Sequence, residues 1–430
     1  MADPVALCRD LIRFDTTNLG NGAGNGERAA AEYVSGILSA AGFAPTLLER
    51  APGRSNVIVR IPGSDPALPA ILAHAHLDVV PADPHDWSVP PFAGEIRDGV
   101  LYGRGSTDMK DVCAMLLAVV QRWQAAGIRP RRDVVLAFVA DEEDQGYFGA
   151  EWLVAEHPAL FEGCAVAISE TGAYTHHVNG VRLYPVATAE RGTAHLRLTA
   201  RGRAGHGSRP NSANAVAILI RALARIADYR WPVHLTPTVR AYLEQTGKAL
   251  GIPVDLSSDA AVDATIAALG SAGGVAATTV RPSTTPTVLQ AGYKVNVIPS
   301  TATAEVDTRL LPGAEESVLA VIDELIGPHI TREFVAHQPP VESPVDSPWF
   351  AAMAAALVAE DSEAVVVPYC MGGGTDAKAF HKIGIDCYGF APLRLPAGYD
   401  YRAQAHGVDE HIPVEALEFG SRVLSRFLLS

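Results

Sequence analysis

The sequence predicts an α/β protein of two domains, with a smaller α+β domain inserted into a larger one. Up to about residue 185, helical segments alternate with short apolar strands, which is typical of a sheet covered by helices on both faces. After about residue 187 the strands become amphipathic, and the first pattern resumes near residue 347. A length of 430 residues with 48% hydrophobic residues is sufficient for two cores.

The elements of the larger domain follow from this alternation. We expect helices near 4–14, 28–41 and 111–126, and later at 349–360 and 414–428. Continuous apolar runs predict buried strands at 56–63, 70–80, 134–140, 164–170 and 364–370.

The inserted domain has a different pattern. Strands are expected at 190–202, 293–299, 301–311 and 329–337, with a helix at 315–326. Residues 214–230 predict an amphipathic helix with one apolar stripe, formed by Val216, Leu219, Ile220, Leu223 and Ile226. The stretch 232–290 is rich in Thr, Pro, Ala, Ser and Gly and carries little signal.

Composition excludes several classes of function. A formal net charge of −14 argues against nucleic acid or an anionic membrane as a partner, because both require clustered Lys and Arg. Asp3 and Asp10 interrupt the region where a signal peptide would be apolar, and no run of about 18 apolar residues occurs, so we expect a cytoplasmic protein. The five cysteines contain no CxxC pair, which favours buried reduced thiols over disulfides or a thiolate zinc site.

Polar residues gather at the predicted strand ends. In the strand 70–80, His76 and Asp78 share a face with Cα atoms about 6.5 Å apart. That spacing suits a metal-ligating histidine whose second ring nitrogen is held by a carboxylate, and His74 on the same face is a rival ligand. A buried histidine that is only hydrogen-bonded is the alternative interpretation.

Carboxylates follow the other strands. Glu142 and Glu143 come directly after an apolar run, where two adjacent charges are costly to bury unless a cation such as a metal ion neutralises them. Glu170 ends another strand and Asp108 precedes a predicted helix. Taken singly, Asp108 could be a helix N-cap and the glutamates surface acids. Taken together, they predict a metal site.

Nine motifs then occur in order between roughly residues 70 and 412: HLDVVP, LYGRGSTDMK, DEED, ISETG, GHGSRP, NVIP, DTR, GGGTDAKAF and AHGVDE. In this combination the chain resembles the dizinc exopeptidase family that includes glutamate carboxypeptidase, acetylornithine deacetylase, succinyl-diaminopimelate desuccinylase, carnosinase-type dipeptidases and aminoacylase. The resemblance implies a mixed-sheet α/β/α catalytic domain formed by residues 1–186 and 339–430. It also implies an inserted lid and dimerisation domain at 187–338.

The resemblance assigns roles to the polar residues. Asp108 would bridge two Zn²⁺ ions per subunit, for which Co²⁺ or Mn²⁺ could substitute. One ion would be held by His76 and Glu170 and the other by Glu143 and His406, which are ligand types that zinc accepts. Glu142 would act as general base, with Asp78 also in the catalytic group. His206, within GHG, would stabilise the oxyanion, often across the interface of a homodimer.

The resemblance also implies a clamp for a substrate carboxylate, formed by Arg309, Asn296 and the loop with Gly373, Gly374 and Thr375. Arginine can bind a carboxylate through two parallel hydrogen bonds, and the three glycines suit a backbone anion nest. An ordinary ion pair for Arg309 and a plain turn for the loop are the alternatives.

The implied reaction is hydrolysis of an amide bond next to a free carboxylate, in a small-molecule dipeptide or carboxypeptidase substrate. The alternative is an N-acyl-amino-acid amidohydrolase, which would use the same metals, base and clamp. A metal-binding scaffold without turnover is disfavoured because it would not need Glu142 as a free base. A dimetal phosphoesterase would need more cations near the metals than the sequence offers.

Overall fold

The structure is a computed structural model that describes residues 3–430, and it divides into two compact units. The first unit contains the described residues up to Thr188, together with Ser343–Pro368 and Thr375–Ser430. The second unit contains Ala189–Glu342 and Tyr369–Gly374. The assignment of residues 187–338 to a lid and dimerisation domain stays a prediction.

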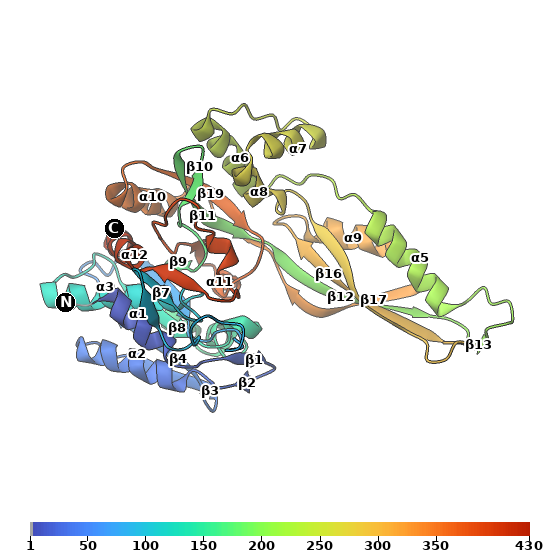
Figure 1. The fold of residues 1–430 in the computed structure, drawn as a ribbon, viewed down its shortest axis with the longest axis horizontal. Coiled ribbons are helices and arrows are strands. Elements are labelled where there is room, and N and C mark those ends of the chain that lie inside the picture. Colours follow the sequence, from blue (N-terminus) through green and yellow to red (C-terminus); the bar gives the residue numbers. More distant parts are fainter. Residues whose placement is uncertain (1–2) are drawn as a thin grey trace. The chain divides into compact units, whose positions relative to one another are not determined.

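A mixed sheet forms the centre of the first unit, with the strand order β10-β11-β20-β9-β5-β8-β4-β3 (Figure 1). Strand β5 pairs in parallel with both β8 and β9, and β20 is parallel to β9, whereas β3, β4 and β11 run antiparallel to their neighbours on this path. The strands are β3 (Thr46–Ala51), β4 (Arg54–Ile61), β5 (Ala70–His76), β8 (Val134–Val139), β9 (Cys164–Ser169), β10 (His176–Val178), β11 (Val181–Glu190) and β20 (Asp386–Gly389). Two more strands, β18 (Val341–Glu342) and β19 (Ala364–Met371), also pair with β11.

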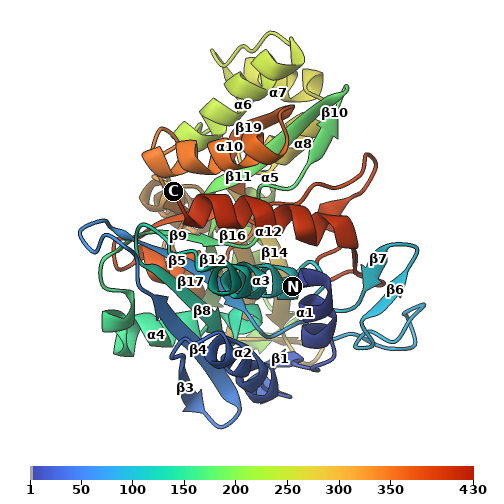
Figure 2. The same ribbon diagram turned by 90° about the vertical axis from the view of Figure 1, so that its left-hand side faces the viewer.

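Helices cover both faces of this sheet. One face packs against α1 (Pro4–Ile12), α2 (Arg28–Ala40), α3 (Lys110–Ala126), α10 (Pro348–Glu360) and α12 (Val414–Leu428). Figure 2 shows α1, α3 and α12 beside one another in front of the strands. The other face packs against α4 (Ala150–Glu156) and α11 (Ala377–His381). The predicted α/β/α architecture with a mixed sheet is therefore confirmed.

Strand β5 contributes side chains to both faces because its residues alternate. Ile71, Ala73 and Ala75 belong to the core beneath α1 and α3, whereas Leu72 belongs to the core beneath α4 and α11. His74 and His76, two and four residues after Leu72, consequently lie on the α4 and α11 face.

Short elements complete the first unit around the sheet. Strand β7 (Val100–Tyr102) pairs with β6 (Glu95–Arg97) on one side and with β21 (His411–Pro413) on the other. The remaining elements are β1 (Asn18–Gly20), β2 (Ala23–Gly24) and the 3₁₀ turns η1 (Glu142–Asp144), η2 (Pro158–Phe161) and η3 (Tyr401–Ala403).

The second unit contains an antiparallel sheet in the order β14-β16-β12-β17, which has its own core beneath α5 and α9 (Figure 1). Its strands are β12 (Gly192–Arg201), β14 (Ser283–Ala291), β16 (Thr301–Leu310) and β17 (Ile330–Gln338), and its two covering helices are α5 (Ala215–Asp228) and α9 (Glu315–Ile326). A separate pair joins β13 (Gly205–His206) to β15 (Val297–Ile298).

Two expectations for this unit need correction. Ile220 was expected in the apolar stripe of α5, but its side chain is 52% exposed, and Leu219 and Ile226 carry the buried face with Ala215 and Ala222. The stretch 232–290, which carried little signal, forms α6 (Pro237–Leu250), α7 (Asp259–Ala268), α8 (Ser271–Ala277) and β14. Side-chain caps at Thr236 and Ser258 begin α6 and α7.

Within residues 3–430, no helix combines the length and the apolar character that a membrane-spanning helix requires.

Candidate metal centre

Three adjacent parallel strands deliver polar residues to one edge of the main sheet. The strands lie in the order β9-β5-β8, so their carboxyl ends meet. His76 is the last residue of β5, Glu170 follows β9, and the turn that contains Glu142 and Glu143 follows β8. Asp108 comes from the loop before α3. This edge is where an α/β sheet ordinarily opens its binding site.

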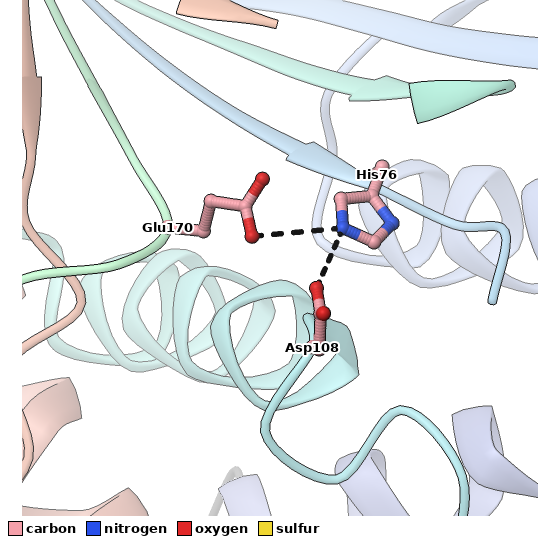
Figure 3. A group of neighbouring side chains, drawn as sticks. All are labelled: His76, Asp108 and Glu170. Atoms are coloured by element: carbon pink, nitrogen blue, oxygen red, sulfur yellow. Dashed lines mark hydrogen bonds and ion pairs between the residues drawn. The ribbon is translucent and has the colours of Figure 1, made fainter. Parts of the chain in front are cut away.

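His76, Asp108 and Glu170 form the first group of possible metal ligands. The Nε2 atom of His76 lies 3.1 Å from Oδ1 of Asp108 and 3.8 Å from Oε2 of Glu170. Figure 3 shows both carboxylates pointing at the same ring nitrogen. His76 is 1% exposed, so its Nε2 atom is shielded from water and contacts the two carboxylates instead.

Asp108, Glu143 and His406 form the second group. The Nε2 atom of His406 lies 3.3 Å from Oδ2 of Asp108 and 3.1 Å from Oε2 of Glu143. The two oxygens of Asp108 therefore face two different histidines. Such a shared carboxylate is what a bridge between two cations requires.

The residues of both groups fit divalent metal ions. Two ligand atoms at about 2.0–2.1 Å from a tetrahedral zinc lie about 3.3 Å apart, close to the nitrogen–oxygen distances between these side chains. Oε1 of Glu143 is buried without a hydrogen-bond partner. The donors are imidazole nitrogens and carboxylate oxygens, which zinc, cobalt and manganese all accept.

The electrostatics of these two groups also suit a cation. Burial and the nearby Asp108 raise the pKa of Glu170 to about 7, and the same two causes raise the pKa of Glu143. Hydrogen bonds to Asp108 and Glu143 raise the pKa of His406 to about 10. The negative charges of the carboxylates thus repel one another and favour protonation of the glutamates and of His406. A bound cation would balance the same negative charge in place of those protons.

Glu142 lies beside both groups but is bonded differently. Its carboxylate lies with His76 and Glu143 in a third possible ligand group. Within the described chain, no hydrogen bond or ion pair reaches this carboxylate. Burial and the charge of Glu170 raise the pKa of Glu142 well above its ordinary value.

Asp78 makes contacts other than the expected one. Nδ1 of His76 lies 2.9 Å from the backbone oxygen of Asp78 and 3.7 Å from its carboxylate, so the backbone carbonyl holds the ring. The carboxylate instead accepts hydrogen bonds from the backbone N–H groups of Glu142 (3.1 Å) and Glu143 (3.2 Å) and from the side chain of Asn18 (2.8 Å). Asp78 therefore fixes the turn that carries the two glutamates.

His74, the rival ligand, belongs to neither group. Its ring lies 4.6 Å from that of Phe380 and both of its nitrogens are buried without a hydrogen-bond partner. Burial, with the nearby His76, lowers the pKa of His74 to about 3, so the ring is neutral. His74 is a packing residue of the α4 and α11 face.

In the second unit, His206 and Asn296 lie close together. Strands β13 and β15 place His206 opposite Val297, and the N–H of Gly207 donates to the backbone oxygen of Asn296 (2.9 Å). Nδ1 of His206 lies 3.2 Å from the backbone nitrogen of Ser208 and 2.8 Å from its hydroxyl, so these contacts engage Nδ1 and not Nε2. His206 is exposed.

The other predicted clamp residues are arranged less simply. The guanidinium of Arg309 donates to both oxygens of Asp307 (2.8 and 3.2 Å) and to the hydroxyl of Thr193 (3.0 Å), so it already has a carboxylate partner. Gly373 and Gly374 are exposed, but neither they nor Gly372 have the left-handed backbone that an anion nest uses. The hydroxyl of Thr375 accepts from the N–H of Ala377 (3.1 Å).

Sequence reasoning missed two residues with contacts at this centre. Asn18 lies far from every motif in the chain, and nothing in the sequence around it signals the contact with Asp78. Glu410 ends the motif AHGVDE, four residues after His406, and its carboxylate accepts from the N–H of Asp108 (3.2 Å).

A three-layer α/β unit with paired histidine and carboxylate groups at the strand ends defines a metallohydrolase class of site. The chain belongs to the peptidase family M20/M25/M40, whose profile matches residues 72–430. It is a hydrolase of that family, as predicted.

Relatives and a solved structure agree with this assignment. The chain is 30% identical to human N-fatty-acyl-amino acid synthase/hydrolase PM20D1, over 83% of this chain and 73% of the relative. It is 28% identical to human aminoacylase-1, over 90% of this chain and 86% of the relative. The M20 family metallo-carboxypeptidase Sso-CP2 from Sulfolobus solfataricus shares the fold, with a TM-score of 0.71, 18% identity and coverage of 100% of this chain and 99% of that chain.

Proposed function

We propose that the chain hydrolyses an amide bond next to a free carboxylate, with two Zn²⁺ ions held at the candidate metal centre. The observation that carries the proposal is the pair of ligand groups that share Asp108, with the Glu142 carboxylate beside them. His76 and Glu170 would hold one ion, and Glu143 and His406 the other. Co²⁺ or Mn²⁺ could take the same ligands.

The chain's own residues would perform the proton transfers. When bound, the ions polarise a substrate carbonyl and lower the pKa of a water molecule. Glu142 would accept a proton from the attacking water molecule and donate it to the leaving amine. Burial and the charge of Glu170 raise the pKa of Glu142, and a nearby cation would oppose this rise because positive charge favours the carboxylate. Asp78 keeps Glu142 in place through the backbone of the turn.

His206 would stabilise the oxyanion through its Nε2–H, and a homodimer would allow it to act in the partner subunit. Arg309, Asn296, Gly373, Gly374 and Thr375 would bind the substrate carboxylate. Arg309 already binds Asp307. A substrate carboxylate would therefore have to displace Asp307, or Asp307 would have to hold the guanidinium in the orientation that binds the substrate.

The first test separates the base from the ligand. Glu142→Gln should retain both zinc ions and lose turnover by about 10²- to 10⁴-fold, the usual contribution of a general base. Glu143→Gln should lose zinc, measured by metal analysis after dialysis. If Glu142→Gln loses the metal and Glu143→Gln keeps it, the two roles are exchanged.

Two kinds of acyl group fit this reaction, and the leaving amine belongs to an amino acid in both cases. A dipeptidase or carboxypeptidase would cleave a peptidyl or aminoacyl group from that amine, and an N-acyl-amino-acid amidohydrolase would cleave an acetyl or fatty acyl group from it. The 30% and 28% identities to PM20D1 and aminoacylase-1 support the acyl candidate. A panel of dipeptides, N-acetyl amino acids and long-chain N-acyl amino acids, compared by kcat/KM, decides between the two. Full activity after exhaustive chelation would contradict both.

A further inference from the structure

Glu410 is a fully buried carboxylate that binds the loop before α3 at several points. It accepts hydrogen bonds from the backbone N–H groups of Gly105 (2.9 Å), Thr107 (2.7 Å) and Asp108 (3.2 Å). It also accepts from the hydroxyl of Thr107 (2.9 Å) and the guanidinium of Arg104 (2.9 Å). A carboxylate with this many donors fixes the peptide planes that point at it.

These contacts act directly on the geometry of Asp108. Asp108 must present Oδ1 to His76 and Oδ2 to His406, at 3.1 and 3.3 Å. The direction of its side chain depends on the peptide planes before it, and Glu410 fixes three N–H groups within residues 105–108. A rotation of that backbone would turn the shared carboxylate away from one of its two histidines.

Glu410 also belongs to the segment that carries His406. The backbone oxygen of Glu410 accepts from the N–H of Gly103 (2.9 Å), and the neighbouring Asp409 accepts from the N–H of Ser88 (2.7 Å). His406, by contrast, is exposed on a segment of turns. Residues 409–410 therefore help to join this segment to the loop of Asp108, together with the hydroxyl of Tyr401, which donates to the backbone oxygen of Thr107 (3.3 Å).

The remaining contacts bury the carboxylate and give it a cationic partner. Arg104, its ionic partner, is 3% exposed and lies over the ring of Trp87, with 5.2 Å from the guanidinium carbon to the ring centroid. The arginine binds Oε2 of Glu410, whereas the N–H groups of Thr107 and Asp108 bind Oε1, so both oxygens of the carboxylate are engaged as acceptors. Among residues 3–430, the possible ligand groups do not include Glu410.

We propose that Glu410 is a positioning residue that sets the separation of Asp108 and His406 and thereby the affinity of the second metal ion. This inference rests on the proposed metal centre. It concerns residues of the chain that would touch neither substrate nor metal.

The test compares Glu410→Gln with a control of matched burial. Asp361 is 4% exposed and also pairs with an arginine, Arg182, but it contacts none of the possible ligands. Asp361→Asn therefore reports the cost of losing a buried carboxylate alone. The chelator-stripped full chain is titrated with zinc in competition with a chromophoric chelator, and Tm is measured with and without zinc.

Glu410→Gln should weaken zinc binding by about 10- to 100-fold, as the loss of partners behind metal ligands usually does. The ion held by Glu143 and His406 should be the one whose binding is weakened. The rise in Tm on adding zinc should also become smaller. Asp361→Asn should lower the Tm of the metal-free chain while its zinc affinity and its zinc-dependent rise in Tm stay those of the natural chain.

Thr107→Val provides a milder variant in case Glu410→Gln does not fold, because it removes only the hydroxyl contact with Glu410. It should also lower the affinity for zinc, but by a smaller factor than Glu410→Gln. Unchanged zinc affinity in Glu410→Gln, or in Thr107→Val if the first variant does not fold, overturns the role of Glu410. A natural chain that binds no zinc overturns the metal centre itself, and the two failures are thus distinguishable.

Discussion

His74 and His76 lie two residues apart on the same face of β5, yet only one of them reaches the metal centre. His76 ends the strand and faces Asp108 and Glu170, whereas His74 packs on Phe380. The difference arises from depth along the strand, since only the carboxyl end opens at the sheet edge. The two histidines are therefore a natural matched pair.

His74→Leu should keep both zinc ions and activity within a few-fold of the natural chain, because the ring is neutral and makes no hydrogen bond. Its free energy of unfolding should change by less than about 1 kcal/mol, since an apolar group of similar volume replaces unpaired polar atoms. His76→Leu should lose zinc and activity. Metal analysis and a urea titration of both variants check this, and loss of zinc from His74→Leu would place His74 among the ligands.

At the residue scale, the sequence predicted which side chains gather but not all of their bonds. His76, Asp108, Glu142, Glu143, Glu170 and His406 come together as the motifs indicated. The contact of Asp78 differs because a backbone carbonyl competes for the ring nitrogen, and side-chain spacing does not report backbone acceptors. Asn18 could not be found for a different reason, because its partner Asp78 is 60 residues away in the chain.

At the scale of elements, Asp361 joins the end of α10 to β11. It accepts two hydrogen bonds from the guanidinium of Arg182 (2.8 and 2.6 Å) and one from the hydroxyl of Tyr184 (2.9 Å). Although burial alone would raise the pKa of the Asp361 carboxyl, these hydrogen bonds hold it below its ordinary value of 3.8.

Asp361→Asn should lower the free energy of unfolding by about 2 kcal/mol at pH 7. Because the pKa is lower in the folded chain, the carboxylate stabilises the fold fully above the unfolded pKa of 3.8 and loses this effect as the pH falls below it. The difference between the natural chain and the variant should therefore be constant from about pH 5 to 8 and shrink below about pH 4. Urea titrations at pH 7 and 3.5 measure it, and an equal difference at both values would exclude the carboxylate charge as its source.

Long periodic elements were predictable and short ones were not. The helices 315–326 and 414–428 have the expected bounds because their apolar residues repeat every three or four positions. Helix α7 was missed because it consists mainly of alanine, aspartate and threonine and buries only Val262 and Thr265. Strands β6, β7 and β10 have three residues each, too few to show a period.

At the scale of the whole molecule, the sequence predicted two domains from the change in pattern near residue 187. The structure divides between Thr188 and Ala189, near the end of the continuous strand β11. Residues Tyr369–Gly374 belong to the second unit although they lie far along the chain, and only three-dimensional contacts reveal this.

If His206 acts in the partner subunit of a homodimer, two inactive variants should restore activity when mixed. Glu142→Gln and His206→Ala would each be nearly inactive alone, but a mixed dimer would contain one centre with both residues intact. Equal amounts, unfolded together and refolded or co-expressed, should recover about a quarter of natural activity, as random pairing in a symmetric dimer gives. No recovery, with mixed dimers shown by mass spectrometry, would place His206 and Glu142 in the same subunit.

The bond between Glu410 and the N–H of Asp108 joins residues 302 positions apart in the chain. During synthesis on the ribosome, Asp108 is therefore made long before its partners His406 and Glu410. Residues 189–342 of the second unit are synthesised between them. Such long-range contacts form slowly and late. A nascent or truncated chain that ends before residue 406 has His76, Asp108 and Glu170 but lacks His406 and Glu410, so binding of the second metal ion would have to wait until residues 406–410 have been made.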